Sequence, residues 1–240
     1  MNMIVEDGDS SASDAIQMKA KEKLGTVVKA RYLVPSKHFR AIASRVLASR
    51  EDSASSKAIG VVSCGRQNGN STVVSNLAVA ISEAIPGEVL LVDSVVKRKS
   101  RGPGWFEFVL GNVDLVDIVR STDVKKLSVL PSGYMSSRNG ITYSKDRLVD
   151  VVQHLREQFE FVLFDLPCID DVAGSGPIAS VLDGVLLNIR SGRVNSSNAA
   201  KVKRELEVQG AHLLGAVLNQ TQSYVPQFLQ AILGRSAGSF

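Results

Sequence analysis

The chain has 240 residues, of which 44% are hydrophobic, so it is long enough to bury one substantial core. Its formal net charge of +4 is small and its basic residues are scattered among acidic ones, which argues against nucleic acid as a partner. The two cysteines suggest neither a disulfide framework nor a zinc site, and no apolar run approaches the ~18 residues that span a bilayer.

Residues 1–30 are rich in serine and charged residues with little periodicity, which predicts a disordered or loosely ordered N-terminal tail. We assign residues 31–240 to a single domain. The stretch 36–50 predicts its first helix, because apolar residues recur there at i, i+3, i+7 and i+8 on one face.

From residue 58 onward, apolar strand-like runs alternate with segments of helical period. The expected strands cover residues 58–64, 89–94, 127–133, 161–167, 184–190 and 213–221, and the expected helices cover 71–84, 146–159, 176–182 and 195–210. Repeated βαβ alternation predicts an α/β fold with a doubly wound, mostly parallel sheet. Ligands of such sheets bind outside the carboxyl ends of the strands.

Residues 63–72, SCGRQNGNST, have the outline of a phosphate-binding loop between a strand and a helix. Such a loop points backbone N–H groups at phosphate oxygens, while a lysine supplies positive charge and a Ser or Thr hydroxyl holds Mg²⁺. Gly69 gives flexibility before the helix, and Ser71 or Thr72 is placed either to ligate Mg²⁺ or to cap the helix. The alternative interpretation is an ordinary strand–turn–helix junction.

The position of the phosphate lysine is occupied by Asn70, whose amide offers a dipole but no charge. Arg66 is the candidate replacement cation, and a solvent-exposed loop charge is its alternative interpretation. Two apolar strands, VLLVD and FVLFD, end in Asp93 and Asp165, as needed to reach Mg²⁺ or to polarise water at the strand ends. For each aspartate alone, a helix cap or turn residue is the alternative.

The order of seven segments along the chain carries further information. They are the loop and helix at 63–84, VLLVDSVVKRKS, GPGWFEFVLGNVDLVDIV, LSVLPSG, FEFVLFDLP, DGVLLNIRSGR and GAVLNQ. In this order and spacing, residues 36–221 resemble the cytoplasmic ATPase domain of bacterial tyrosine kinases (BY-kinases) that work with polysaccharide co-polymerases. This family lies within the wider MinD and ParA type of P-loop ATPases. The resemblance implies the P-loop NTPase fold and the cofactors ATP or ADP with Mg²⁺.

Residue roles follow from the resemblance position by position. The implied nucleotide-binding residues are Gly69, Ser71, Thr72 and Asn219, the last at the base; the implied Mg²⁺ contacts are Ser71, Asp93 and Asp165. To the nucleotide-binding set we add Asn70, at the position of the lysine, and Arg66, the candidate replacement cation. The segment 37–43 resembles a helix that packs subunits into a ring, so Phe39 and Arg40 are expected at an interface of a homo-oligomer.

The departures from the family pattern fall on catalytic positions. Asn70 replaces the phosphate lysine, and Val95 replaces the second aspartate of a D-x-D motif. We therefore interpret Asp93 and Asp165 as vestigial or weak catalytic residues and expect inefficient phosphoryl transfer.

The function predicted from the sequence is that of a catalytically degenerate, regulatory or structural protein in exopolysaccharide or capsule biosynthesis. Its expected partner is an inner-membrane polysaccharide co-polymerase or export component, so the expected location is cytoplasmic, at the inner face of the membrane through that partner. One alternative is an active tyrosine autokinase or ATPase of polysaccharide biosynthesis. A second is a MinD or ParA type positioning ATPase.

Overall fold

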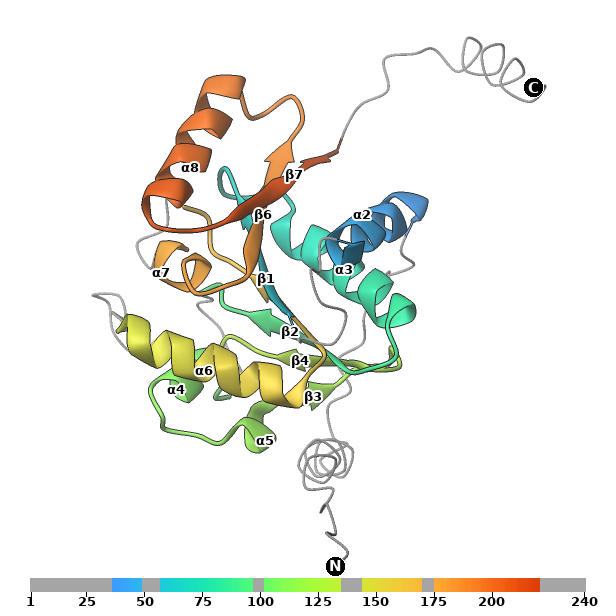
Figure 1. The fold of residues 1–240 in the computed structure, drawn as a ribbon, viewed down its shortest axis with the longest axis vertical. Coiled ribbons are helices and arrows are strands. Elements are labelled where there is room, and N and C mark those ends of the chain that lie inside the picture. Colours follow the sequence, from blue (N-terminus) through green and yellow to red (C-terminus); the bar gives the residue numbers. More distant parts are fainter. Residues whose placement is uncertain (1–35, 49–56, 97–101, 135–143, 170–174, 221–240) are drawn as a thin grey trace, which may run out of the picture.

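The computed structural model describes residues 36–48, 57–96, 102–134, 144–169 and 175–220, so the expected tail at 1–30 lies outside the described residues. The described residues form a seven-stranded sheet in the order β3-β4-β2-β5-β1-β6-β7 (Figure 1). The strands are β1 (Lys57–Ser63), β2 (Val89–Asp93), β3 (Arg120–Ser121), β4 (Leu127–Leu130), β5 (Phe161–Asp165), β6 (Gly184–Arg190) and β7 (Leu213–Asn219). Only the short β3 pairs antiparallel with its neighbour.

Helices cover both faces of this sheet (Figure 1). They are α2 (Lys37–Ala48), α3 (Asn70–Ala84), α4 (Trp105–Val109), α5 (Leu115–Ile118), α6 (Lys145–Gln158), α7 (Gly176–Ala179) and α8 (Ser196–Val208). Buried residues of α2 and α3 pack on one face, and those of α4 to α8 pack on the other. The doubly wound, mostly parallel sheet expected from the sequence is confirmed.

The apolar runs of the central strands arise because both faces of the sheet are covered. In β1, Ala58 and Val62 enter the hydrophobic cluster beneath α4 to α8, whereas Ile59 and Val61 enter the cluster beneath α2 and α3. Strand β1 lies between β5 and β6, so it is buried from its second residue to its end.

The structure adds three short elements that the sequence analysis did not assign: α4, α5 and β3. The strand expected at residues 127–133 is shorter in the structure, because β4 ends at Leu130. Beyond that point the carbonyls of Pro131 and Ser132 accept hydrogen bonds from the backbone N–H groups of Trp105 and Phe106, at 2.7 and 3.1 Å. The chain after β4 therefore anchors the first turn of α4 and no longer extends the sheet.

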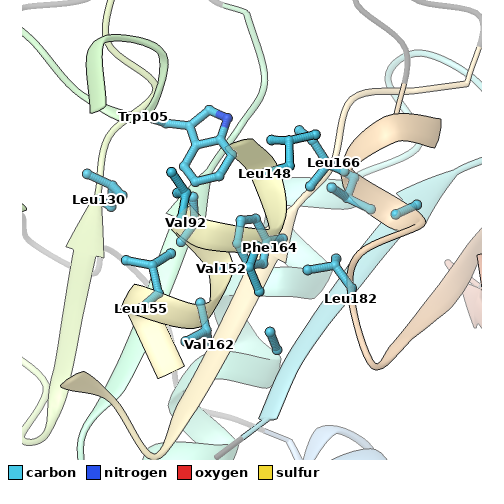
Figure 2. Packing of buried hydrophobic residues seen from close by; sticks show 14 of the residues in the cluster. Val92, Trp105, Leu130, Leu148, Val152, Leu155, Val162, Phe164, Leu166 and Leu182 are labelled. Carbon is cyan, nitrogen blue, oxygen red and sulfur yellow. The ribbon is translucent and has the colours of Figure 1, made fainter. Parts of the chain in front are cut away.

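Trp105 is the largest fully buried side chain and anchors α4 to the sheet. Its ring meets that of Phe164 edge to face, with centroids 5.3 Å apart and an interplanar angle of 81°. Figure 2 shows the indole over Val92 and Phe164, with Leu130 beside them. This aromatic pair joins α4 to β5, the strand that carries Asp165.

We expect Trp105→Ala to lower the free energy of unfolding by about 3–5 kcal/mol, because it removes a large buried side chain from a packed cluster. Leu110→Ala is the matched control, since Leu110 caps the same helix but is 52% exposed, and it should change the free energy by less than about 0.5 kcal/mol. Urea denaturation of both variants measures this difference. Equal effects of the two substitutions would contradict this account of the core.

Candidate functional site

The loop between β1 and α3 turns on two residues in the left-handed backbone region. Gln67 has a φ of +59° and Gly69 a φ of +75°. A β-carbon at position 69 would also lie 2.9 Å from Nδ2 of Asn219, so glycine is required there for both conformation and space. Within the loop, the Ser63 hydroxyl donates to the carbonyl of Gly65 at 2.8 Å. Residues 63–69 thus form a compact, internally bonded turn ahead of α3.

The side chain of Asn70, the first residue of α3, points at the gap between β1 and β5. Its Nδ2 donates to Oδ1 of Asp165 at 2.8 Å, to the carbonyl of Val61 at 2.9 Å and to the carbonyl of Leu166 at 3.3 Å. Both hydrogens of the amide are therefore used inside the protein. The residue that stands in place of the phosphate lysine is held against the sheet by a carboxylate and two carbonyls.

Side chains from β6 and β7 bond to the other side of the loop. Nδ2 of Asn188 donates to Oδ1 of Asn70 at 3.2 Å and to the carbonyl of Asn68 at 3.3 Å. Asn219, the last residue of β7, donates from Nδ2 to the same Asn68 carbonyl at 3.0 Å. Arg190 donates from Nη1 to the carbonyl of Gln67 at 3.1 Å. The side chains of Asn70, Asn188, Asn219 and Arg190 thus connect the loop to four strands: β1, β5, β6 and β7.

The sequence analysis missed Asn188, Arg190 and Asn68. One signal was present in the sequence, because Asn188 interrupts the apolar run GVLLNIR in a strand that is otherwise buried at this depth. A fully buried amide needs hydrogen-bond partners, so an asparagine in an apolar strand predicts polar groups close to it.

The two expected carboxylates meet at the end of neighbouring strands. Asp93 of β2 and Asp165 of β5 are register partners, and parallel neighbours lie roughly 5 Å apart. Asp165 is buried, whereas Asp93 is partly exposed and accepts the N–H of Val95 at 3.2 Å. The structure therefore brings the two aspartates and the loop together at the carboxyl ends of the strands, as expected for a parallel sheet. Their catalytic role stays a prediction.

The remaining expected nucleotide contacts lie on the open side of the loop. Ser71 and Thr72 are exposed in the first turn of α3, and no side chain caps that helix at Gly69. Arg66 is exposed as well. These three residues are accessible to a ligand, and Mg²⁺ or phosphate binding by them stays a prediction. Among the described residues, no group of three or more His, Cys, Asp or Glu side chains could hold a metal ion.

The expected interface residues lie on α2, which packs against α3. Arg40 forms an ion pair with Glu83 of α3, with Nη2 and Oε2 3.1 Å apart, and both side chains are about half exposed. Phe39 packs at the margin of the cluster beneath α2 and α3. Both residues thus have partners within their own chain, and a role in subunit packing stays a prediction. None of the helices in the described ranges combines the length and apolarity that membrane crossing requires.

No family model matches the chain, but curated proteins do. The tyrosine-protein kinase CpsD of Streptococcus agalactiae is 26% identical over 200 residues, which cover 80% of this chain and 86% of that protein. The tyrosine-protein kinase YwqD of Bacillus subtilis is 28% identical over 171 residues, covering 68% and 72%. The succinoglycan biosynthesis transport protein ExoP of Rhizobium meliloti is 22% identical over 177 residues, covering 69% of this chain and 22% of ExoP.

Solved structures agree with these relatives. The crystal structure of the chimerical protein CapA2B2 matches with a TM-score of 0.66 and 26% identity, over 77% of this chain and 84% of that one. The septum site-determining protein MinD of Pyrococcus horikoshii, complexed with Mg-ADP, matches in fold with a TM-score of 0.58 and 21% identity, over 74% and 77%. The homologues of this chain are therefore bacterial tyrosine kinases, and its structural neighbours are BY-kinase domains and P-loop ATPases of the MinD and ParA type.

Proposed function

We propose that this chain is a BY-kinase-like protein of exopolysaccharide or capsule biosynthesis in which phosphoryl transfer is weak or absent. It would act as a regulatory or structural cytoplasmic partner of an inner-membrane polysaccharide co-polymerase or export component. Its tyrosine-kinase relatives, and a relative named for succinoglycan biosynthesis and transport, support the polysaccharide assignment.

The observation that carries the proposal is the set of hydrogen bonds made by Asn70. A phosphate lysine works by placing a fixed cation beside the β and γ phosphates, and groups of this kind are typically worth about 10² to 10³ in rate. The Asn70 amide is neutral, and its donor group is bonded to Asp165 and to two strand carbonyls. It therefore supplies no positive charge to a phosphate.

The residues beside Asp93 support the same conclusion. Val95, at the second position of the D-x-D motif in the resemblance, is a hydrocarbon that can neither ligate Mg²⁺ nor polarise water. Asp93 itself accepts the backbone N–H of Val95 and so closes a local turn. Two of the charged groups expected for phosphoryl transfer are therefore replaced by neutral ones.

One observation favours the alternative of an active kinase or ATPase. The Arg190 guanidinium lies against the loop, where it donates to the carbonyl of Gln67, so a cation is present beside the loop despite the loss of lysine. Arg66 on the loop is a second exposed cation. Arginine binds phosphate well, and either residue could serve that role in an active enzyme.

We expect purified wild-type protein to show negligible Mg·ATP hydrolysis and no autophosphorylation. Asn70→Lys should raise the affinity for Mg·ATP about tenfold or more, because it restores a cation at the start of α3. Asn70→Gln is the matched control, since it lengthens the side chain without adding charge. Calorimetric titration gives the affinities, and robust turnover by the wild type would refute the proposal.

Substitution of the two arginines separates the proposal from the active-enzyme alternative. Arg66→Ala and Arg190→Ala should each change the residual turnover of Mg·ATP by less than about threefold, because no efficient transfer depends on them. A fall of about 10² in turnover for either variant, measured with saturating ATP, would instead identify the replacement cation of a working enzyme.

A complementation assay in the source organism tests the structural role directly. Deletion of the gene should lower surface polysaccharide, and Asp93→Ala should restore it as well as the wild-type gene does, because the proposed role needs no catalysis. Asp146→Ala, on the exposed first turn of α6, is the control for expression and folding. If Asp93→Ala failed to complement at normal protein levels, the proposed role would be wrong.

A further inference from the structure

Asn188 is a fully buried polar residue near the carboxyl end of β6, between β1 and β7. It lies on β6, pairs in register with Ser63 of β1, and has no exposed surface. The four residues that precede it in β6 are also buried and apolar or glycine. An apolar side chain at position 188 would continue this run, so the buried amide is an exception to the apolar pattern of the preceding four residues.

The orientation of the Asn188 amide is determined by its two acceptors. Nδ2 faces both the Asn68 carbonyl and Oδ1 of Asn70, at 3.3 and 3.2 Å. The reversed amide would place an oxygen against two oxygens. In the observed orientation the buried Oδ1 of Asn188 has no hydrogen-bond partner in the part of the chain that the structure describes. The amide thus keeps its donation to the loop even though its own acceptor is unsatisfied.

This donation affects the backbone of the loop. Because the C=O and N–H of a peptide unit point in opposite directions, the Asn68 carbonyl held toward β6 and β7 turns the Gly69 N–H to the other side. Within the described residues, the N–H groups of Asn68, Gly69 and Asn70 donate to no acceptor. Successive free N–H groups beside left-handed residues and a helix N-terminus form an anion-binding concavity.

We propose that Asn188 is a positioning residue that holds the loop 63–70 in an anion-binding shape in the absence of a lysine. It does so by holding the Asn68 carbonyl toward β6 and β7 and by bonding to the Asn70 side chain, which lies against Asp165. This inference deepens the proposed function and rests on it, because it explains how a chain without phosphoryl transfer retains a phosphate-recognition loop. The ligand class is a pyrophosphate group, free or as part of a nucleoside diphosphate.

The test uses amide hydrogen exchange and the binding of inorganic pyrophosphate in the full chain. Asn188→Leu should raise exchange in residues 64–70 by about tenfold or more and weaken pyrophosphate binding by about tenfold, because two hydrogen bonds to the loop are lost. Exchange in β2, β4 and β5 should not change. Asn112→Leu, the same substitution at an exposed position after α4, should change neither measurement.

Asn188→Ala is the second variant, in case the leucine prevents folding, because alanine is smaller than asparagine and removes the donor. It should loosen the loop as the leucine does. A double-mutant cycle with Asn70→Ala should be non-additive in loop exchange, which a purely structural effect of Asn188 on the sheet would not produce.

Unchanged loop exchange in both Asn188 variants would overturn the positioning role. Failure of the wild type to bind pyrophosphate would overturn the anion-binding shape, yet it would leave the proposed function standing, since that requires only weak transfer. Conversely, rapid ATP turnover by a wild type whose loop depends on Asn188 would refute the proposed function and leave the positioning role intact.

Discussion

The hydrogen bond between Asn70 and Asp165, 2.8 Å long, is the contact on which the rest of the site depends. It joins the first residue of α3 to the end of β5 and places a neutral amide between two strands. Since Asp165 is buried, a donor at this position also stabilises its carboxylate. The bond therefore joins the start of α3 to the sheet and satisfies a buried acid, without placing a charge in the loop.

The parallel sheet brings the other members of the site to this bond. Strands β1, β2, β5, β6 and β7 run in one direction, so their carboxyl ends meet at one edge, where residues separated by more than a hundred positions become neighbours. Asn188 and Asn219 approach the loop from one side, and Asp93 and Asp165 lie on the other. The site is a consequence of strand order, because the polar groups that contact the loop lie near the carboxyl ends of neighbouring strands.

The sequence predicted the long elements well, because apolar runs in buried parallel strands and helical periodicity carry strong signals. It also placed Asp93, Asp165 and the loop at one edge, since strand direction alone brings those ends together. It did not predict α4, whose start depends on hydrogen bonds with the distant segment after β4, or α5, which is a single turn of four residues. Nor could it predict the contacts of Asn188, because the direction of a side chain in a strand depends on the register with its neighbours.

Helix α3 connects the loop to the core. Its position depends on the packing of many buried residues, whereas the charge at its first position depends on the one side chain at residue 70. It begins at Asn70, and nine of its fifteen residues are buried between α2 and the sheet, so the whole helix is fixed by the packing of the interior. Codons for lysine and asparagine differ by a single nucleotide, so the charge at this position can change in one mutational step. The position of α3 has no comparably short route to change, because nine of its residues are packed in the interior and moving the helix would require several of them to change together. In evolutionary terms, a scaffold of this kind can lose its chemistry quickly and still retain its form for a long time.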